Sequence, residues 1–157
     1  MKVSIITISF NANKTIEKTL SSVAGQSYQN IEHIIVDGGS KDNTLEICNS
    51  FSHISKIISE SDRGVYDAFN KGLKLATGNV VGFLNADDIF YDYNSVKEIV
   101  DAFSKNNTDI VYGNLDYINE DGKVVRNWIS KSYKKGLIKK AWMPAHPTFY
   151  CKKEVYD

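Results

Sequence analysis

Two adjacent carboxylates, Asp87 and Asp88, come directly after an apolar run that ends in Phe83 and Leu84. A buried strand that ends in this way places two like charges beside an apolar wall, which costs free energy unless a cation joins them. Mg²⁺ is commonly held by one or two carboxylates together with phosphate oxygens of a substrate. The pair therefore indicates a site for a metal and a diphosphate. The alternative is that Asp88 or Asp92 only caps the helix that follows.

Three other apolar runs also end in polar segments. These segments are Ser9-Phe10-Asn11, Asp37-Gly38-Gly39-Ser40 and Glu60-Ser61-Asp62-Arg63-Gly64. In an open α/β sheet, ligands bind outside the carboxyl ends of the strands, so all four segments are expected at one edge. Asp and Gly also favour turns, so a single segment of this kind would indicate little. Four of them at one edge predict a ligand site.

Several residues in or near these segments suit a phosphorylated ligand. The Asp37 carboxylate can accept hydrogen bonds from a base imide or a ribose hydroxyl, or it can form a local turn into Gly38. Arg63 can hold two phosphate oxygens at once. Lys71 shares a helix face with Asp67, so a solvated ion pair is the alternative to a phosphate contact.

Further candidates lie near the end of the chain. His146 stands between Pro144 and Pro147, which fix the backbone of a shaped loop. It is a weak candidate for an acceptor contact or a metal ligand, and the alternative is a loop residue without a role. A basic stretch either contacts an anionic lipid-linked acceptor or forms a solvated helix face. Its lysines are at positions 131, 134, 135, 139 and 140, beside Trp128, Tyr133 and Trp142. We expect His33 and His53 to be structural.

The elements that must position these residues alternate between strands and helices. Runs rich in β-branched residues predict strands over residues 3–8, 31–36, 54–58, 79–84 and 109–112. Apolar residues at helical spacing predict four helices between and after these strands, carrying Ile16, Leu20 and Val23; Leu45, Ile47 and Phe51; Phe69, Leu73 and Ala76; and Val96, Ile99, Val100 and Phe103. Asp42 or Asn43 can cap the second helix, and Gly78 is placed to end the third.

This alternation predicts a mostly parallel sheet with helices on both faces. After Gly113 the alternation of strands and helices stops. Two short predicted strands, 115–118 and 123–128, flank the turn sequence Asn119-Glu120-Asp121-Gly122, and this pattern is typical of a hairpin. We therefore expect an alternating α/β part over residues 1–113, followed by an appended region over residues 114–157 within the same structural domain.

The amino-acid composition indicates the broad structural class of the protein. The chain has 157 residues, 42% of them hydrophobic and 24% charged, with zero formal net charge. These values are typical of one globular domain and give no reason to expect a nucleic-acid partner. Cys48 and Cys151 form neither a disulfide framework nor a zinc motif. The apolar run at 3–8 is too short for a signal sequence, and no run of about 18 apolar residues occurs. We expect a cytoplasmic location.

Taken together, these segments resemble the family-2 inverting glycosyltransferases of the GT-A fold, especially bacterial enzymes of surface-polysaccharide assembly. The matching segments occur in the family's order and cover nearly the whole chain: 3–11, 35–44, 59–72 and 82–88. The resemblance implies an α/β fold with a Rossmann-like, mostly parallel sheet flanked by helices, followed by a C-terminal β-hairpin extension. It also implies Mg²⁺ or Mn²⁺ as the cofactor, nucleotide-sugar binding by residues 1–113, and an acceptor-side region that residues 114–157 begin but do not complete.

The resemblance implies roles for individual residues. Ser9, Phe10 and Asn11 would line the pocket for the nucleotide base, and Asp37 would bind the base or the ribose. The base and the diphosphate would lie near Asp62, Arg63 and Lys71. The DXD-like motif would be Asn85-Ala86-Asp87, with Asn85 in the place of the first carboxylate, and Asp87 and Asp88 would hold the metal.

The implied reaction is a single displacement that moves a sugar from a nucleotide-diphosphate sugar to an acceptor hydroxyl, on a glycan or lipid-linked glycan. This would associate the protein with the inner face of the membrane. In the family the general base lies in a later acidic motif, which we expect beyond Asp157. The chain is thus expected to bind the donor but to transfer poorly or not at all.

Two other enzyme classes fit the sequence less well. A nucleotidyltransferase needs a glycine-rich, basic phosphate loop after the first strand, where this chain has Ser-Phe-Asn-Ala-Asn. A dinucleotide dehydrogenase needs a GxGxxG motif, which the sequence lacks. The remaining alternatives are not enzymes: a receiver-like module with an acidic pocket, or a non-catalytic nucleotide-sugar-binding module.

Overall fold

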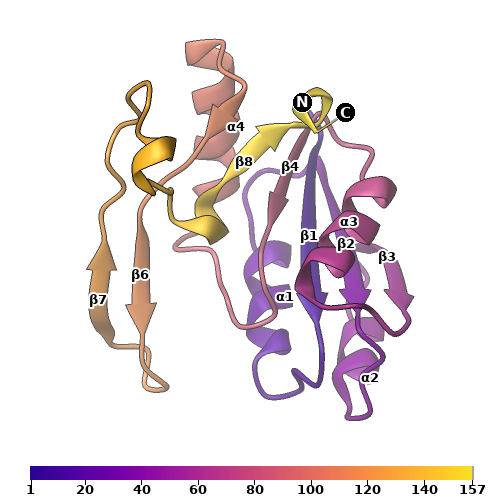
Figure 1. Cartoon of the computed structure of the whole chain (residues 1–157). Helices are drawn as coiled ribbons and strands as arrows, with labels where there is room; N and C mark the ends of the chain where they lie inside the picture. The colour runs from indigo at the N-terminus through magenta and orange to yellow at the C-terminus, as the bar shows by residue number, and fades with distance from the viewer. Residues whose placement is uncertain (157) are drawn as a thin grey trace.

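The computed structural model describes residues 1–156, which fold as an α/β structure around a six-stranded sheet (Figure 1). Four strands pair in parallel, as the sequence predicts: β1 (Val3–Ser9), β2 (Ile31–Asp37), β3 (Ile54–Ser59) and β4 (Val80–Phe83). The strand order across the sheet is β3-β2-β1-β4-β8-β5. The expected mostly parallel sheet is therefore confirmed.

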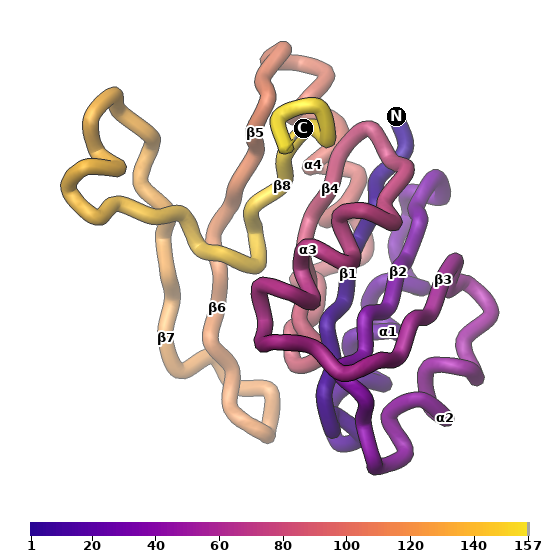
Figure 2. Tube along the Cα trace, turned by 45° about the vertical axis from the view of Figure 1, so that its right-hand side comes forward, coloured from indigo at the N-terminus to yellow at the C-terminus, as the bar shows by residue number. Residues whose placement is uncertain are grey.

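Helices cover both faces of this sheet (Figures 1 and 2). They are α1 (Ile16–Ala24), α2 (Thr44–Asn49), α3 (Val65–Leu75) and α4 (Ser95–Asn106). Successive side chains of a strand point to opposite faces, so neighbouring residues of β1 contact different helices. Ile5 belongs to a core cluster with Val23 of α1 and Val100 of α4, whereas Ile6 packs in a cluster with Ala68 of α3.

Beyond β4, one strand of the sheet runs against all the others. β8 (Tyr150–Lys152) pairs antiparallel with both β4 and β5 (Ile110–Val111). The sequence predicts a longer strand over 109–112 and no strand near residue 150. Gly82 makes the insertion of β8 possible, because a Cβ at that position would lie 2.0 Å from Cε1 of Tyr150. The segment after residue 113 therefore returns to complete the main sheet.

The expected hairpin is present as a separate two-stranded sheet, β6 (Leu115–Ile118) and β7 (Val124–Trp128). Its turn is closed by Asn119, whose Oδ1 accepts a hydrogen bond from Lys123 N at 2.9 Å. Figure 1 shows the hairpin standing beside the main sheet. Three single 3₁₀ turns follow it, η1 (Ile138–Lys140), η2 (His146–Thr148) and η3 (Lys153–Val155).

Two details of the predicted helices are wrong. α3 ends at Leu75, so Gly78 does not terminate it. A Cβ on Gly78 would lie 2.7 Å from Ser4 N, and a glycine is needed there for a close approach to β1. α2 ends at Asn49, so Phe51 lies beyond the helix that was expected to carry it.

Two histidines form a buried polar pair on β2 and the loop before β3. Nδ1 of His33 lies 3.0 Å from Nε2 of His53, and Nε2 of His33 lies 2.9 Å from Oγ1 of Thr7. Burial and the neighbouring His53 lower the pKa of His33 to about 3. The pair is therefore held neutral inside the fold, which is a structural arrangement.

No helix within residues 1–156 combines the length and the apolar character that crossing a bilayer requires.

Candidate functional site

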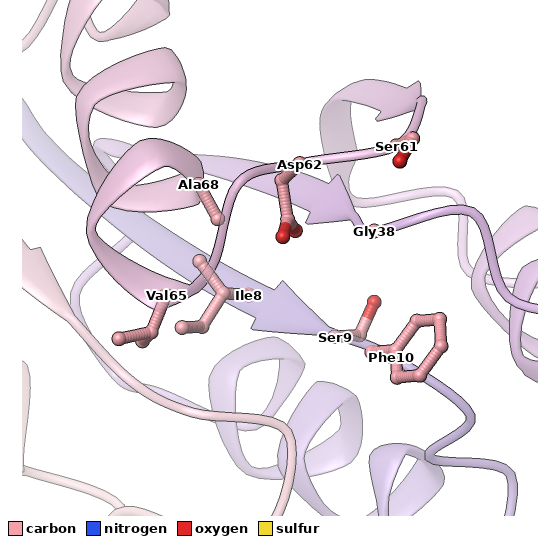
Figure 3. A pocket seen from close by; sticks show the side chains of 8 residues that line it. All are labelled: Ile8, Ser9, Phe10, Gly38, Ser61, Asp62, Val65 and Ala68. Carbon is pink, nitrogen blue, oxygen red and sulfur yellow. The ribbon is translucent and has the colours of Figure 1, made fainter.

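A cavity of about 420 Å³ opens at the carboxyl ends of β1 and β2 (Figure 3). Four parts of the chain line it: the end of β1, the loop after β2, the loop after β3 and the first turn of α3. The lining residues are Ile8, Ser9, Phe10, Gly38, Ser61, Asp62, Val65 and Ala68. The cavity thus lies where the sheet topology predicts a ligand site, and three of the polar strand-end segments meet there.

Phe10 and Asp62 give this cavity its chemical character. The Phe10 side chain is 64% exposed, so a large aromatic surface is open at the cavity. In Figure 3 the Asp62 side chain points from its loop toward the ends of the two strands. One Asp62 oxygen, Oδ1, accepts a hydrogen bond from Gly64 N at 2.9 Å. Within residues 1–156 the other oxygen has no donor, so it is available to a ligand.

Gly38 allows these two groups to converge. A Cβ at Gly38 would lie 2.7 Å from Oδ2 of Asp62 and 3.3 Å from Cδ2 of Phe10. Any side chain at this position would therefore push the carboxylate or the ring aside. The sequence shows Gly38 only as a turn residue, and its role in shaping the cavity becomes visible in the fold.

Asp37 is turned into the protein. It is fully buried, and its Oδ2 accepts hydrogen bonds from Gly39 N, Ser40 N and Ser59 Oγ at 3.0, 2.9 and 2.7 Å. Its Oδ1 accepts from the hydroxyls of Ser9 and Ser40. Burial alone would raise the pKa of Asp37, but these hydrogen bonds outweigh it and hold the pKa below its usual value. The arrangement matches the turn interpretation, and direct contact with a nucleotide stays a prediction.

Asn11 also joins loops and does not line the cavity. Its backbone lies in the left-handed region with a φ of 48°. Asn11 N donates to Ser40 Oγ at 2.8 Å, and its Oδ1 accepts from Lys41 N at 2.9 Å. The end of β1 is thereby fixed to the loop after β2. A role of Asn11 in the base pocket would have to act through this fixed loop geometry.

Lys71 holds the loop after β3. Its Nζ lies 3.0 Å from Oε1 of Glu60, 3.3 Å from Oδ2 of Asp67 and 3.0 Å from the carbonyl oxygen of Ser61. The hydrogen bond to Glu60 is the largest influence on the pKa of Lys71, and it raises that pKa. The ion-pair alternative is thus present in the structure. Arg63 is exposed and, within residues 1–156, its guanidinium pairs with no carboxylate, so its phosphate contact stays a prediction.

The acidic pair lies just past the end of β4. Ala86 is buried, Asp87 is exposed and Asp88 is half-buried. Asn85 fixes the turn, because its Nδ2 donates to Oδ2 of Asp88 at 3.0 Å and its carbonyl accepts from Asp88 N at 3.0 Å. Burial first, and then the charge of Asp87, raise the pKa of Asp88. A bound cation would stabilise this arrangement of charges.

The capping alternative does not hold for Asp88. α4 begins at Ser95, and its N-cap position is Asn94. The nearby carboxylate that organises this turn is Asp92, whose Oδ1 accepts from Asn94 N at 2.7 Å. Asp88 is therefore not used by the helix and remains available to a ligand.

His146 approaches the acidic pair from the loop before β8. Its ring centroid lies 5.5 Å from that of Phe69, which packs at 4.5 Å against Phe83 at the end of β4. The charge of His146 lowers the pKa of Asp88 and thus opposes burial and the charge of Asp87, which raise it. Because β8 lies next to β4, the fold brings His146 and Asp88 to the same side of the site.

The described residues do not form a complete metal cage. Within residues 1–156 no three His, Cys, Asp or Glu side chains are grouped closely enough to hold an ion by themselves. Mg²⁺ typically takes only one or two carboxylates from the protein and completes its shell with water and substrate phosphates. The Asp87–Asp88 pair fits that kind of site.

Three lining residues were not anticipated: Ile8, Val65 and Ala68 form an apolar wall between β1 and α3. Their sequence signal is weak, because a buried alanine and an exposed valine at the start of a helix are ordinary features of helix packing. Gly72 allows α3 to pack closely on β1, because a Cβ at that position would lie 2.4 Å from Cγ2 of Ile6.

Comparison with known proteins identifies relatives of this chain. The family model described as Glycosyl transferase family 2 matches residues 4–153. WfgD of Escherichia coli, a UDP-Glc:alpha-D-GlcNAc-diphosphoundecaprenol beta-1,3-glucosyltransferase, is 39% identical over 126 residues, which are 78% of this chain and 49% of WfgD. The PGL/p-HBAD biosynthesis glycosyltransferase Rv2957 of Mycobacterium tuberculosis is 37% identical over 117 residues, which are 71% of this chain and 46% of that protein. The chain thus spans about half the length of these relatives.

Solved structures share the fold. TarS of S. aureus in complex with UDP-GlcNAc matches with a TM-score of 0.83 at 22% identity, over 99% of this chain and 46% of TarS. The mannosyltransferase PcManGT of Pyrobaculum calidifontis, in complex with GDP-Man and Mn²⁺, matches with a TM-score of 0.75 at 21% identity, over 98% of this chain and 45% of PcManGT. The expected GT-A fold is thereby confirmed, and the extent of the family match shows that this chain belongs to glycosyl transferase family 2.

Proposed function

We propose that this chain binds a nucleotide-diphosphate sugar and serves the transfer of its sugar to an acceptor hydroxyl in polysaccharide or glycolipid assembly. The observation that carries the proposal is the cavity at the strand ends, where an open aromatic ring and a free carboxylate oxygen lie on the same edge of the sheet as an acidic pair. The family membership and the nucleotide-sugar names of the relatives support it.

The nucleoside end of the donor would occupy the cavity. The exposed face of Phe10 suits stacking against a planar base. The free Oδ2 of Asp62 can accept a hydrogen bond from a base N–H or a ribose hydroxyl. Lys71 and Asp37 hold the loops that carry these groups, so the site is organised before a ligand arrives.

The diphosphate would lie between α3 and the acidic pair. Within residues 1–156 the amide groups of Val65 and Tyr66, in the first turn of α3, have no backbone or side-chain acceptor. Free N–H groups at a helix N-terminus favour anions. Arg63, directly before this turn, is exposed and can add a positive charge.

Asp87 and Asp88 are the residues that would hold Mg²⁺ or Mn²⁺. When bound, the metal supplies positive charge that offsets the charge developing on the leaving diphosphate. Asn85 fixes the orientation of Asp88, and the exposed Asp87 carboxylate has no competing hydrogen-bond or ion-pair partner in the described chain. His146, from the loop before β8, would contact the sugar or the metal on the same side of the site as Asp88.

The reaction would be an inverting displacement at the anomeric carbon, with a carboxylate base that takes the acceptor proton. Glu154 does not suit this role, because it lies in an exposed turn with its Oε1 4.0 Å from Nζ of Lys152. Asp157 lies outside the described residues.

The acceptor would be a glycan or a lipid-linked glycan, reached at the inner face of the membrane from the cytoplasm. The name of WfgD, which acts on a diphosphoundecaprenol-linked sugar, supports an acceptor of this class. A nucleotidyltransferase activity finds no support in the family match.

Calorimetry with UDP, GDP and dTDP, each with and without Mn²⁺, tests the proposal. We expect one of them to bind, and to bind more tightly with Mn²⁺. Asp87→Asn should remove the gain from Mn²⁺ and leave the metal-free affinity nearly unchanged. Asp101→Asn makes the same chemical change on the exposed face of α4 and should alter neither value. Absence of nucleotide binding under every condition would overturn the proposal.

A further inference from the structure

The charges of this chain are divided unequally along the sequence. Lys and Arg together balance Asp and Glu, at 19 each. Residues 122–153 nevertheless contain nine Lys and Arg residues and no Asp or Glu. The remainder of the chain is therefore acidic, and the part that follows the turn of the hairpin is strongly basic. A local positive field of this kind attracts an anionic surface even when the whole chain is neutral.

The centre of this basic part is the segment 129–143, which we call the basic loop. It carries five lysines, all of them exposed, at positions 131, 134, 135, 139 and 140. None of the five pairs with a carboxylate in the part of the chain that the structure describes. Their charges are thus not neutralised inside the fold.

The same loop exposes large apolar side chains. Ile129 and Ile138 are each 67% exposed, and Met143 is 68% exposed. Ile138 directly precedes Lys139 and Lys140 in the 3₁₀ turn η1. A solvated basic face would explain the lysines alone, but it does not explain why apolar side chains stand among them.

The inner side of the basic loop is fixed to the fold. The ring of Trp142 lies 5.5 Å from that of Tyr112 and 5.4 Å from that of Tyr133. Tyr133 N donates to the hydroxyl of Tyr112 at 2.8 Å, and Ser130 Oγ donates to the carbonyl of Gly113 at 2.6 Å. Aromatic contacts therefore hold the loop from within and leave its lysines and apolar side chains exposed.

The loop is also placed to meet a large partner. Figures 1 and 2 show this segment at the end of the hairpin away from its turn, on the outer edge of the molecule and off the main sheet.

We propose that the basic loop docks this chain on an anionic phospholipid surface. Lysines near such a surface gain electrostatic attraction, and exposed Ile and Met side chains gain by entering the boundary between headgroups and acyl chains. A nucleic acid would use the lysines but would leave the apolar side chains without a partner. The purpose of the docking, to bring the site to a lipid-linked acceptor, rests on the proposed function, whereas the docking itself does not.

Co-sedimentation with vesicles tests the docking. The full chain should bind vesicles of phosphatidylcholine mixed with phosphatidylglycerol and should not bind vesicles of phosphatidylcholine alone. Lys139→Gln/Lys140→Gln should weaken binding on the order of 30-fold at low salt, from the attraction of two lysines to an anionic leaflet. The matched control Lys18→Gln/Lys105→Gln removes two exposed lysines elsewhere and should leave binding unchanged.

A second double variant tests how much the exposed apolar side chains contribute to vesicle binding. Ile138→Ser/Met143→Ser changes side chains that are already exposed, so the melting temperature should stay the same. Binding that persists at high salt, where the charges are screened, should be lost in this variant. Retention of that binding would contradict insertion of the loop.

Three results would overturn the proposal: equal binding to neutral vesicles, equal loss in both lysine variants, or no binding to anionic vesicles. A dimer in solution that Ile138→Ser/Met143→Ser dissolves, together with absent vesicle binding, would assign the loop to a second copy of the chain instead. Nucleotide affinity of Lys139→Gln/Lys140→Gln should equal that of the unaltered chain, so a failure of docking and a failure of the proposed function remain distinguishable.

Discussion

The contact between Gly82 and Tyr150 couples the acidic pair to the loop that carries His146, and it can be broken with one methyl group. Gly82 lies in β4, three residues before Asn85, and pairs in register with Tyr150 of β8. The Tyr150 ring lies directly over the glycine. Gly82→Ala would place a Cβ 2.0, 2.4 and 2.5 Å from three atoms of that ring.

The size of the effect follows from how little space is available. Ordinary contacts of a Cβ begin at 3.4 Å, so the ring must move by more than an ångström. Tyr150 is only 1% exposed and cannot move outward without losing core contacts. Overpacking costs about 1–3 kcal/mol, and full loss of a buried aromatic side chain costs about 3–5 kcal/mol. We therefore expect Gly82→Ala to lower the free energy of unfolding by about 2–4 kcal/mol.

Urea denaturation of four proteins measures this effect: the unaltered chain, Gly82→Ala, Tyr150→Ala and the double variant. The three atoms nearest to the added methyl group all belong to the Tyr150 ring. The double variant should therefore be more stable than the sum of the single effects predicts, by about 1–3 kcal/mol. Gly113→Ala is the matched control, because the nearest atom to its Cβ is Thr148 Cβ at 4.0 Å. Additive costs in the double variant would refute the reasoning.

Three further predictions concern acid stability and the cavity. The pKa of His33 is about 3 in the folded chain, which is below its pKa in the unfolded chain. The stability that neutral His33 contributes is therefore complete above about pH 6.5. It falls at lower pH because the unfolded chain takes up a proton there. Lowering the pH to about 5 should cost about 2 kcal/mol in urea denaturation. Lys71→Met should weaken nucleotide binding by calorimetry, on the order of tenfold, with little change in the urea midpoint, because the loop after β3 loses its anchor. Gly38→Ala should weaken nucleotide binding to a similar degree, on the order of tenfold, by displacing the Asp62 carboxylate.

Each of these predictions has a control. Replacing both His33 and His53 with Leu should flatten the dependence of stability on pH in this range, and an unaltered chain that is equally stable at both pH values would contradict the argument. Lys74→Met removes an exposed lysine from the same helix as Lys71 and should not change nucleotide affinity. Gly113→Ala should likewise leave that affinity unchanged, so an equal loss in this variant would contradict the assignment of Gly38 to the cavity.

Local patterns in the sequence predict the strands β1 to β4 and the helices between them, because each element buries its own run of apolar residues. β8 could not be predicted in this way. Tyr150-Cys151-Lys152 is too short to show a period, and its pairing depends on space that Gly82 leaves in a distant strand. The position of β5 could not be predicted for the same reason, because β8 separates it from β4, whereas its parallel direction relative to β1 to β4 agrees with the predicted sheet.

The candidate site was predicted in outline. Because the carboxyl ends of parallel strands meet at one edge, Ser9, Phe10 and Asp62 were expected together, and all three line the cavity. Residue type alone does not show which way a side chain turns. Asp37 and Asn11 face other loops because neighbouring hydroxyls and amides occupy their oxygens. Their direct contact with a nucleotide, like the metal at Asp87 and Asp88, stays a prediction.

The antiparallel position of β8 has a consequence for the order in which the molecule can fold. β1 to β4 are joined by connections that are complete once about the first half of the chain has been synthesised. The outer edge of β4, however, gains its partner only when residue 150 has emerged, and within residues 1–156 β5 pairs only with β8. Domains fold during synthesis as units, and unpaired strand edges favour association with other chains. A ribosome-bound chain that stops short of residue 150 should therefore expose the edge that leads to the acidic pair, and it should be open to proteolysis there.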